Sequence, residues 1–120
     1  MSKKILVIDD ELALVDMLKM RLEASHYEVI TALDGKTGLE RAIKEVPNLI
    51  ILDIAMPELD GFEVLEQLKK NEKTRSIPVL MLTAKGDTNA IMESQELKAT
   101  DHLIKPFDPD ELLRLIDRYA

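Results

Sequence analysis

The sequence is poor in several residue types, and each shortage excludes a class of protein. It contains no cysteine, which excludes disulfides and thiolate metal sites. Aromatic residues make up only 3% of its 120 residues and tryptophan is absent, so we expect an aliphatic core. No apolar run approaches the roughly 20 residues that a helix needs to cross a bilayer. We therefore expect no membrane insertion.

Basic residues are also in the minority. There are 16 of them against 23 acidic residues, which gives a net charge of −7. A protein that binds nucleic acid directly normally carries a basic patch, so we expect no direct nucleic-acid binding. The apolar stretch after Lys3 and Lys4 covers only residues 5–8, which is too short for a signal peptide. These features favour a cytoplasmic protein with one domain, residues 1–120.

Two hydrophobic patterns alternate along the chain. Short apolar runs predict strands at residues 4–8, 27–32, 49–52, 79–82 and 102–104. Segments with helical spacing of apolar residues follow each of them, and the segment at 87–97 has the weakest pattern. This alternation is typical of an α/β fold, in which parallel strands form a sheet with helices on both faces.

The helix ends carry recognisable signals. Asp34 is a predicted N-cap, and the pairs Asp60 with Glu63 and Asp108 with Glu111 have the spacing of capping boxes. Pro57 and Gly61 are predicted to keep the chain from entering a helix directly after Asp53. Asp53 is therefore expected at the edge of a loop, at the end of a buried strand.

Polar side chains follow four of the five predicted strands. They are Asp9 and Asp10 after the first strand, Asp53 after the third, Thr83 after the fourth and Lys105 after the fifth. The second strand ends in apolar residues, as expected of a strand at the edge of the sheet. Since functional sites of open parallel sheets lie at the carboxyl ends of the strands, we expect these five side chains to converge.

Three converging carboxylates repel one another and need a cation. With no cysteine or histidine beside them, all the ligands are oxygens, which suits Mg²⁺ or, alternatively, Mn²⁺. A magnesium ion held in this way usually shares its coordination shell with a phosphate, and Lys105 and Thr83 offer an ammonium and a hydroxyl to phosphoryl oxygens. Asp53 is then a candidate nucleophile that forms an acyl phosphate.

Four segments together resemble the receiver domain of bacterial two-component response regulators. They are Ile-Leu-Val-Ile-Asp-Asp-Glu (5–11), Asp-Ile-Ala-Met-Pro-Glu-Leu-Asp-Gly (53–61), Leu-Thr-Ala-Lys (82–85) and Asp-His-Leu-Ile-Lys-Pro-Phe (101–107). No single segment is decisive, but four in this order and spacing are specific, and the resemblance covers the whole chain. It implies a flavodoxin-like doubly wound sheet with strand order 2-1-3-4-5.

The resemblance also implies roles for the site residues. Asp53 would accept a phosphoryl group from a sensor histidine kinase or a histidine phosphotransfer protein. The implied Mg²⁺ ligands are Asp9, Asp10, Asp53 and the backbone carbonyl of Ala55, and the implied phosphoryl contacts are Thr83 and Lys105. Thr83 and His102 would form the switch, and the fourth helix, fifth strand and fifth helix would contact a downstream protein target. Such a domain promotes only its own phosphorylation and dephosphorylation and is not otherwise an enzyme.

Three further implications concern single positions. The Lys105–Pro106 peptide bond is expected to be cis. Lys98 stands where the family usually has glycine, so we expect a strained or altered turn there. His102 stands where the family usually has tyrosine or phenylalanine, which leaves two interpretations open, a switch residue or an ordinary surface histidine.

Rival interpretations differ in their requirements. A haloacid-dehalogenase-type phosphohydrolase needs a second aspartate two residues after its nucleophile, where this chain has Ala55. A flavodoxin-like cofactor carrier needs a phosphate-cradling loop after the first strand, where the acidic residues 9–11 would repel phosphate. A non-phosphorylated receiver-like module usually lacks one of the key residues, and a receiver excised from a longer regulator is the alternative to a stand-alone one.

Overall fold

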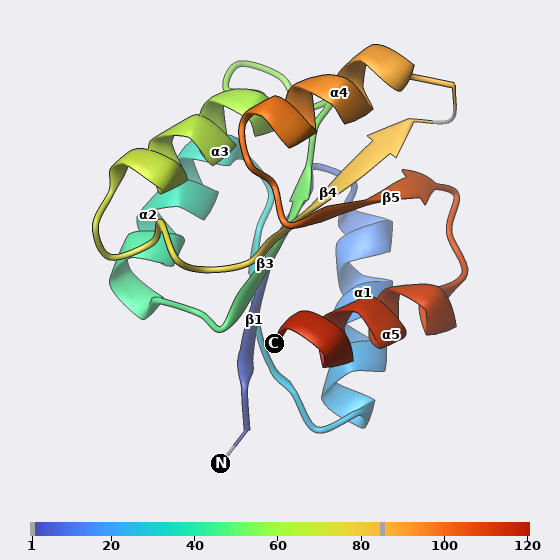
Figure 1. Ribbon diagram of the computed structural model, residues 1–120. Coiled ribbons are helices and arrows are strands. Elements are labelled where there is room, and N and C mark those ends of the chain that lie inside the picture. Colours follow the sequence, from blue (N-terminus) through green and yellow to red (C-terminus); the bar gives the residue numbers. More distant parts are fainter. Residues whose placement is uncertain (1, 85) are drawn as a thin grey trace.

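The computed structural model describes residues 2–84 and 86–120, in which strands and helices alternate. The elements are β1 (Lys4–Ile8), α1 (Leu12–Ala24), β2 (Glu28–Ala32), α2 (Gly35–Glu45), β3 (Leu49–Asp53), α3 (Gly61–Lys70), β4 (Val79–Ala84), α4 (Thr88–Glu96), β5 (Asp101–Lys105) and α5 (Pro109–Tyr119). In this described part, five parallel strands form one sheet in the order β2-β1-β3-β4-β5 (Figure 1). The predicted flavodoxin-like fold and its strand order are confirmed.

Two apolar clusters cover the two faces of the sheet, because successive residues of a strand point to opposite faces. In β3, Ile50 and Leu52 pack in the cluster beneath α2, α3 and α4, whereas Leu49 and Ile51 pack in the cluster beneath α1 and α5 (Figure 1). Every residue of β3 is buried, as its unbroken apolar run predicts for a central strand. The buried core side chains of the described residues are aliphatic or methionine, as the scarcity of aromatics predicts.

The strand limits differ from the prediction at the carboxyl ends. β3 includes Asp53, β4 continues through Thr83 to Ala84, and β5 runs from Asp101 to Lys105. β2 begins one residue later than predicted, at Glu28. Polar residues can extend these strands because the backbone hydrogen bonds between strands do not depend on side-chain polarity. Asp53 is aligned with Leu82, and Ala84 with Lys105.

Aspartates cap four helices, and the predicted caps hold with one correction. Asp34 accepts a hydrogen bond from the backbone N–H of Thr37, and Asp60 accepts one from Glu63. Asp87 caps α4 in the same way. At α5, however, Asp108 accepts from the N–H of Asp110, whereas the N–H of Glu111 donates to the backbone carbonyl of Asp108, so the predicted capping box is wrong there.

Among the described residues, four residues other than glycine have a positive φ: His26, Val46, Glu58 and Lys98. Two of them end helices or stand where glycine was expected. Lys98, where glycine was expected, has a φ of 65°, so the predicted strain in the α4–β5 turn is confirmed. Val46, which ends α2, has a φ of 44°, which the sequence did not indicate. The left-handed conformation costs roughly 1–2 kcal/mol for a residue with a Cβ atom. Both turns are therefore held by the packing of the elements on either side of them.

Candidate functional site

The carboxyl ends of four neighbouring strands bring the predicted site residues together. Asp9 follows β1, and Asp53 is the last residue of the adjacent strand β3. Thr83 lies near the end of β4, and Lys105 ends β5. The edge strand β2 ends in Ala32, as predicted. Parallel alignment alone explains this convergence, because all strands of such a sheet end on the same side.

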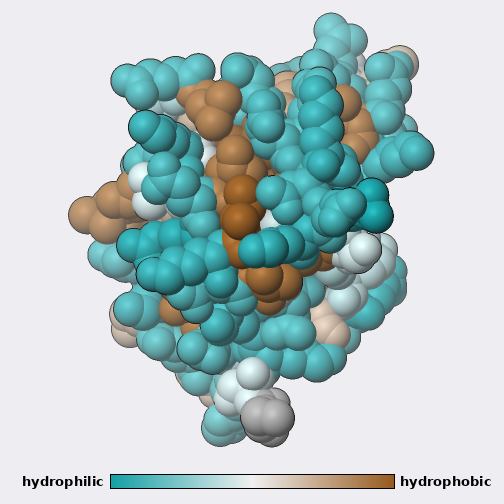
Figure 2. Space-filling view, turned by 90° about the vertical axis from the view of Figure 1, so that its left-hand side faces the viewer, coloured by the Kyte–Doolittle hydropathy of each residue, from teal (hydrophilic) through white to brown (hydrophobic). Residues whose placement is uncertain are grey.

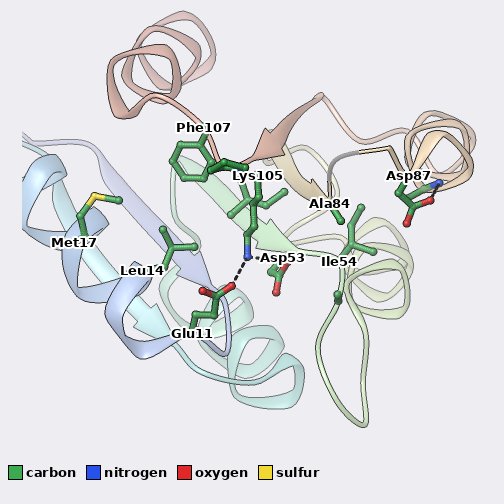
Figure 3. A pocket seen from close by; sticks show the side chains of 13 residues that line it. Glu11, Leu14, Met17, Asp53, Ile54, Ala84, Asp87, Lys105 and Phe107 are labelled. Atoms are coloured by element: carbon green, nitrogen blue, oxygen red, sulfur yellow. Dashed lines mark hydrogen bonds and ion pairs between the residues drawn. The ribbon is translucent and has the colours of Figure 1, made fainter.

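Three carboxylates and one ammonium form the centre of the site. Asp9, Asp10 and Asp53 each offer a carboxylate oxygen, and these oxygens all lie within 4.8 Å of one another. The Nζ atom of Lys105 lies 2.9 Å from an oxygen of Asp9 and 3.3 Å from one of Asp53. It also donates to Glu11 at 3.1 Å (Figure 3). The role of Glu11 as a third partner of Lys105 was missed in the sequence, although it completes the acidic stretch at residues 9–11.

Burial and charge change the proton affinity of two of these groups. Asp53 is 4% exposed, and its burial, together with the nearby Asp9 carboxylate, raises its pKa to about 6. Lys105 partly opposes this increase. Burial by itself lowers the pKa of the Lys105 ammonium, but hydrogen bonds and charges of the surrounding carboxylates outweigh it, so this pKa lies above its ordinary value. At neutral pH the buried Asp53 side chain is therefore mostly ionised, and this buried charge lowers the stability of the folded protein.

A buried hydroxyl near the end of β4 has no hydrogen-bond partner among the described residues. The side chain of Thr83 is almost fully buried, and its Oγ1 atom contacts no donor or acceptor among the described residues. A buried polar atom without a partner costs about 1–3 kcal/mol, so such an atom needs an explanation. A ligand bound at the carboxyl ends of the strands would provide this explanation, because it could accept a hydrogen bond from the Thr83 hydroxyl.

Two other predicted residues have different surroundings. Ala55 is exposed in the loop after β3 and lines the same pocket as Asp53. His102 is half-buried and lines a separate small pocket beside the end of α4. Its Nδ1 atom lies 4.0 Å from a carboxylate oxygen of Asp101, whose other oxygen accepts a hydrogen bond from Tyr119 at 2.9 Å. Lys85, which completes the 82–85 segment, lies outside the described residues.

Gly61 has a role that its sequence context did not reveal. The helix after the Pro57 loop was expected to start near Gly61, and Gly61 is the first residue of α3. A Cβ atom at this position would lie 2.3 Å from the backbone oxygen of Asp53 and 2.6 Å from the Cα atom of Ile54. The Gly61 N–H donates to the carbonyl of Ile54 at 2.9 Å. Gly61 therefore allows α3 to begin directly against the strand end that carries Asp53.

The donor set of this cluster fits a hard divalent cation. Its three carboxylates supply only oxygen ligands, and Asp10 is exposed, so solvent reaches the cluster from one side. Magnesium prefers oxygen ligands and keeps several of its waters, which suits a cluster with one open side. Among the described residues, no helix is both long and apolar enough to cross a membrane.

Removing the Asp53 charge is expected to stabilise the metal-free protein. Because its folded pKa of about 6 exceeds its ordinary value of 3.8, the unfavourable charge is present above pH 6 and is lost as the pH falls. Between pH 7.5 and 5 the free energy of unfolding should rise by about 1.4 kcal/mol from this group. Asp53→Asn should melt higher than the parent at pH 7.5 in EDTA, by roughly 1–2 kcal/mol in stability, and lack this pH-dependent gain.

The measurement is thermal melting followed by circular dichroism, since the chain has no tryptophan. Asp10→Asn is the matched comparison, and its exposed carboxylate should give a smaller gain. Mg²⁺ at ten times its dissociation constant should add about 1.4 kcal/mol to the parent and much less to either variant. If the variants melt below the parent in EDTA, the carboxylates are stabilised by donors, and the account of a repulsive cluster is wrong.

Comparison with known proteins gives matches over nearly the whole chain. The family model of the response regulator receiver domain matches residues 5–117. The chain is 47% identical over 112 residues to the alkaline phosphatase synthesis transcriptional regulatory protein PhoP of Bacillus subtilis. That alignment covers 93% of this chain but 46% of PhoP, so the chain spans about half the length of this relative.

Solved structures agree with the sequence matches. The chemotaxis protein CheY4 of Vibrio cholerae superposes with a TM-score of 0.94 at 33% identity, and the match covers 100% of both chains. The receiver domain of a sensor histidine kinase from Pseudomonas aeruginosa, which has a magnesium ion coordinated in its active site cleft, superposes with a TM-score of 0.90 at 25% identity. That match covers 99% of this chain and 98% of the other. The Lys105–Pro106 peptide bond is cis, as the family resemblance implies.

Proposed function

Because the chain belongs to the response regulator receiver family, we propose that it is a phosphorylation-controlled signalling domain whose phosphoacceptor is Asp53. The phosphoryl group would come from the phosphohistidine of a sensor histidine kinase or a histidine phosphotransfer protein. One observation carries this assignment. Asp53 lies buried at the end of the central strand, beside two further carboxylates and the Lys105 ammonium.

Magnesium is the cofactor that the acidic cluster supports, with Mn²⁺ as the alternative. Asp9, Asp10, Asp53 and the backbone carbonyl of Ala55 would hold it, and the magnesium in the Pseudomonas aeruginosa receiver domain supports this choice. When bound, the ion neutralises charge on the carboxylates and on the phosphoryl oxygens. This charge neutralisation makes the cluster compatible with an incoming phosphoryl group.

The chain's own residues supply the remaining chemistry. The Asp53 carboxylate is the nucleophile, and its raised pKa still leaves it mainly ionised at neutral pH. Lys105 forms ion pairs with Asp9 and Asp53 in the free site and would turn its ammonium toward a phosphoryl oxygen. The Thr83 hydroxyl would donate to another phosphoryl oxygen, which would satisfy the orphaned atom. The domain would promote only its own phosphorylation and dephosphorylation.

Phosphorylation would then change a protein-binding surface formed by α4, β5 and α5. Thr83 and His102 are the proposed switch residues, and α4 is the element best suited to move, because only Ala90 and Ser94 of this helix are buried. α5 is more firmly held, because its two buried residues, Leu112 and Ile116, have larger apolar side chains. Asp110 of α5 forms an ion pair with Arg21 of α1. The Tyr119 hydroxyl of α5 donates a hydrogen bond to the carboxylate of Asp101.

The partners outside the site are a kinase or phosphotransfer protein and a downstream protein. We propose that residues 1–120 form one receiver domain that acts in the cytoplasm without binding nucleic acid itself. The PhoP relative is a transcriptional regulator about twice as long, which supports the alternative that this receiver controls an output segment in a longer protein. A non-phosphorylated interaction module is the other alternative, and the complete set of site residues argues against it.

Incubation with acetyl phosphate and Mg²⁺ tests the proposal directly. We expect a mass gain of about 80 Da, the mass of one phosphoryl group, in intact-protein mass spectrometry. The gain should require Mg²⁺ and vanish in EDTA. Failure of the folded protein to gain this mass with either acetyl phosphate or a phosphorylated histidine donor would support the non-phosphorylated module instead.

A phosphoryl mimic should reveal the proposed switch. Addition of beryllofluoride and Mg²⁺ is expected to shift backbone amide resonances across residues 83–105, because α4 has few buried contacts to hold it in place. Residues of α1 away from the site should shift little. The same titration of Asp53→Asn is the control, and shifts confined to the neighbours of Asp53 would mean that the surface does not switch.

A further inference from the structure

The candidate site opens into a pocket that is much larger than a phosphoryl group. Its volume is about 570 Å³, and both Asp53 and Lys105 line it. At the α1 end the wall consists of Leu14, Met17 and Phe107, three half-buried side chains that pack on the core below them. Figure 3 shows these three side chains on the side of Lys105 that carries α1 and the segment after β5. None of them takes part in the phosphoryl chemistry assigned above.

We propose that this apolar wall, formed by Leu14, Met17 and Phe107, binds the acyl group of small acyl phosphates. The site would then use donors with longer aliphatic acyl groups in preference to acetyl phosphate. This inference rests on the proposed function, because it names the class of small-molecule donor that phosphorylates Asp53. The size and chemistry of the pocket are those of ligand sites, which are largely apolar with a few converging polar groups.

The side chains that line the pocket indicate which end receives the acyl group. The far end contains the small side chain of Ala84 and the carboxylate of Asp87, which would repel a departing carboxylate (Figure 3). At the α1 end the apolar side chains of Leu14, Met17 and Phe107 line the pocket, and the Glu11 carboxylate there forms an ion pair with Lys105 at 3.1 Å. An acyl group at this end meets apolar side chains. The occupant that fits is therefore an uncharged aliphatic chain attached to the acyl phosphate.

The transfer step balances without any additional reactant. A carboxylate oxygen of Asp53 attacks phosphorus, and a new P–O bond to Asp53 forms. The bond between phosphorus and the acyl oxygen breaks, and its electron pair leaves with the acyl group as a free carboxylate. One acyl phosphate is exchanged for another, so no proton, oxidant or reductant is consumed. Mg²⁺ is the cation present during the reaction.

Butyryl phosphate and acetyl phosphate are the informative pair of donors, because their leaving carboxylates are almost equally basic and differ mainly in apolar surface. The measurement is the initial rate of phosphorylation against donor concentration, followed by intact-protein mass spectrometry with saturating Mg²⁺. The second-order rate constant for butyryl phosphate should exceed that for acetyl phosphate by about three- to tenfold, since two methylene groups become partly buried. Equal constants in the parent protein would overturn the inference.

Variants of α1 locate the effect. Met17→Ala and Met17→Gln should both bring the ratio of the two rate constants close to one, while the rate with acetyl phosphate shows that each variant still has a working site. Met20→Ala is the matched control, because Met20 lies on the same helix, is 73% exposed and is not part of the pocket wall. Its ratio should equal that of the parent.

The outcomes separate this inference from the proposed function. Phosphorylation by both donors with a ratio that no Met17 variant changes would mean that the apolar wall does not hold the acyl group and is instead a surface for a macromolecular partner. Absence of phosphorylation by either donor and by a phosphorylated histidine donor would contradict the proposed function itself, and this inference with it.

Discussion

Asp53→Asn is expected to abolish phosphorylation completely. With acetyl phosphate and Mg²⁺, the parent should gain about 80 Da and the variant should gain nothing, because an amide is too weak a nucleophile to form the acyl phosphate. The substitution keeps the shape of a side chain that is 4% exposed, so the variant should remain folded. Loss of labelling would then reflect lost chemistry rather than lost structure.

Two controls make this result specific. Asp16→Asn changes an exposed carboxylate of α1 that lies outside the site, and it should be labelled like the parent. Asp9→Asn changes a buried neighbour of Asp53 without removing the nucleophile, and it should slow labelling without blocking it, because only one proposed ligand of the cation is lost. Equal labelling of Asp53→Asn and the parent would mean that another residue accepts the phosphoryl group.

Gly61→Ala is expected to cause the largest loss of stability among the substitutions considered. The new Cβ atom would meet the backbone of Asp53 and Ile54 at 2.3 and 2.6 Å, and backbone cannot move aside as the end of a flexible side chain can. Overpacking of this kind costs about 3 kcal/mol. The corresponding fall in melting temperature is roughly 10 °C for a domain of this size. Thermal or urea unfolding followed by circular dichroism would measure it.

The same substitution should also impair the site. To relieve the clash, the start of α3 and the end of β3 must separate, which displaces Asp53 from the Lys105 ammonium, now 3.3 Å away. Gly86→Ala is the matched control, because a Cβ atom there meets nothing within 4 Å and only the φ of +85° opposes it. That variant should lose only about 1 kcal/mol. Equal stabilities of Gly61→Ala and the parent would show that the close approach relaxes freely.

Local patterns in the sequence were sufficient to predict the architecture. The unbroken apolar stretch at 49–52 identified the central strand, and aspartates before helical segments identified the caps at Asp34 and Asp60. These features depend on neighbours two to four residues away, where backbone geometry sets fixed periods. The convergence of the strand-end residues also followed from the sequence, since strands that alternate with helices are parallel and end on the same side of the sheet.

The tertiary structure alone decided how those residues interact. Lys105 pairs with Asp9 and Glu11, which are 96 and 94 residues away in the sequence, and the Thr83 hydroxyl is left without a partner among the described residues. Gly61 is needed because α3 starts against the backbone of Asp53, and not because the loop needs a flexible residue. Such distances depend on strand register and on the packing of helices against the sheet. These are long-range properties, which the types and spacing of neighbouring residues do not determine. The sequence by itself therefore determined which chemical groups reach this edge of the sheet, and only the packing of the whole domain decided which of them touch.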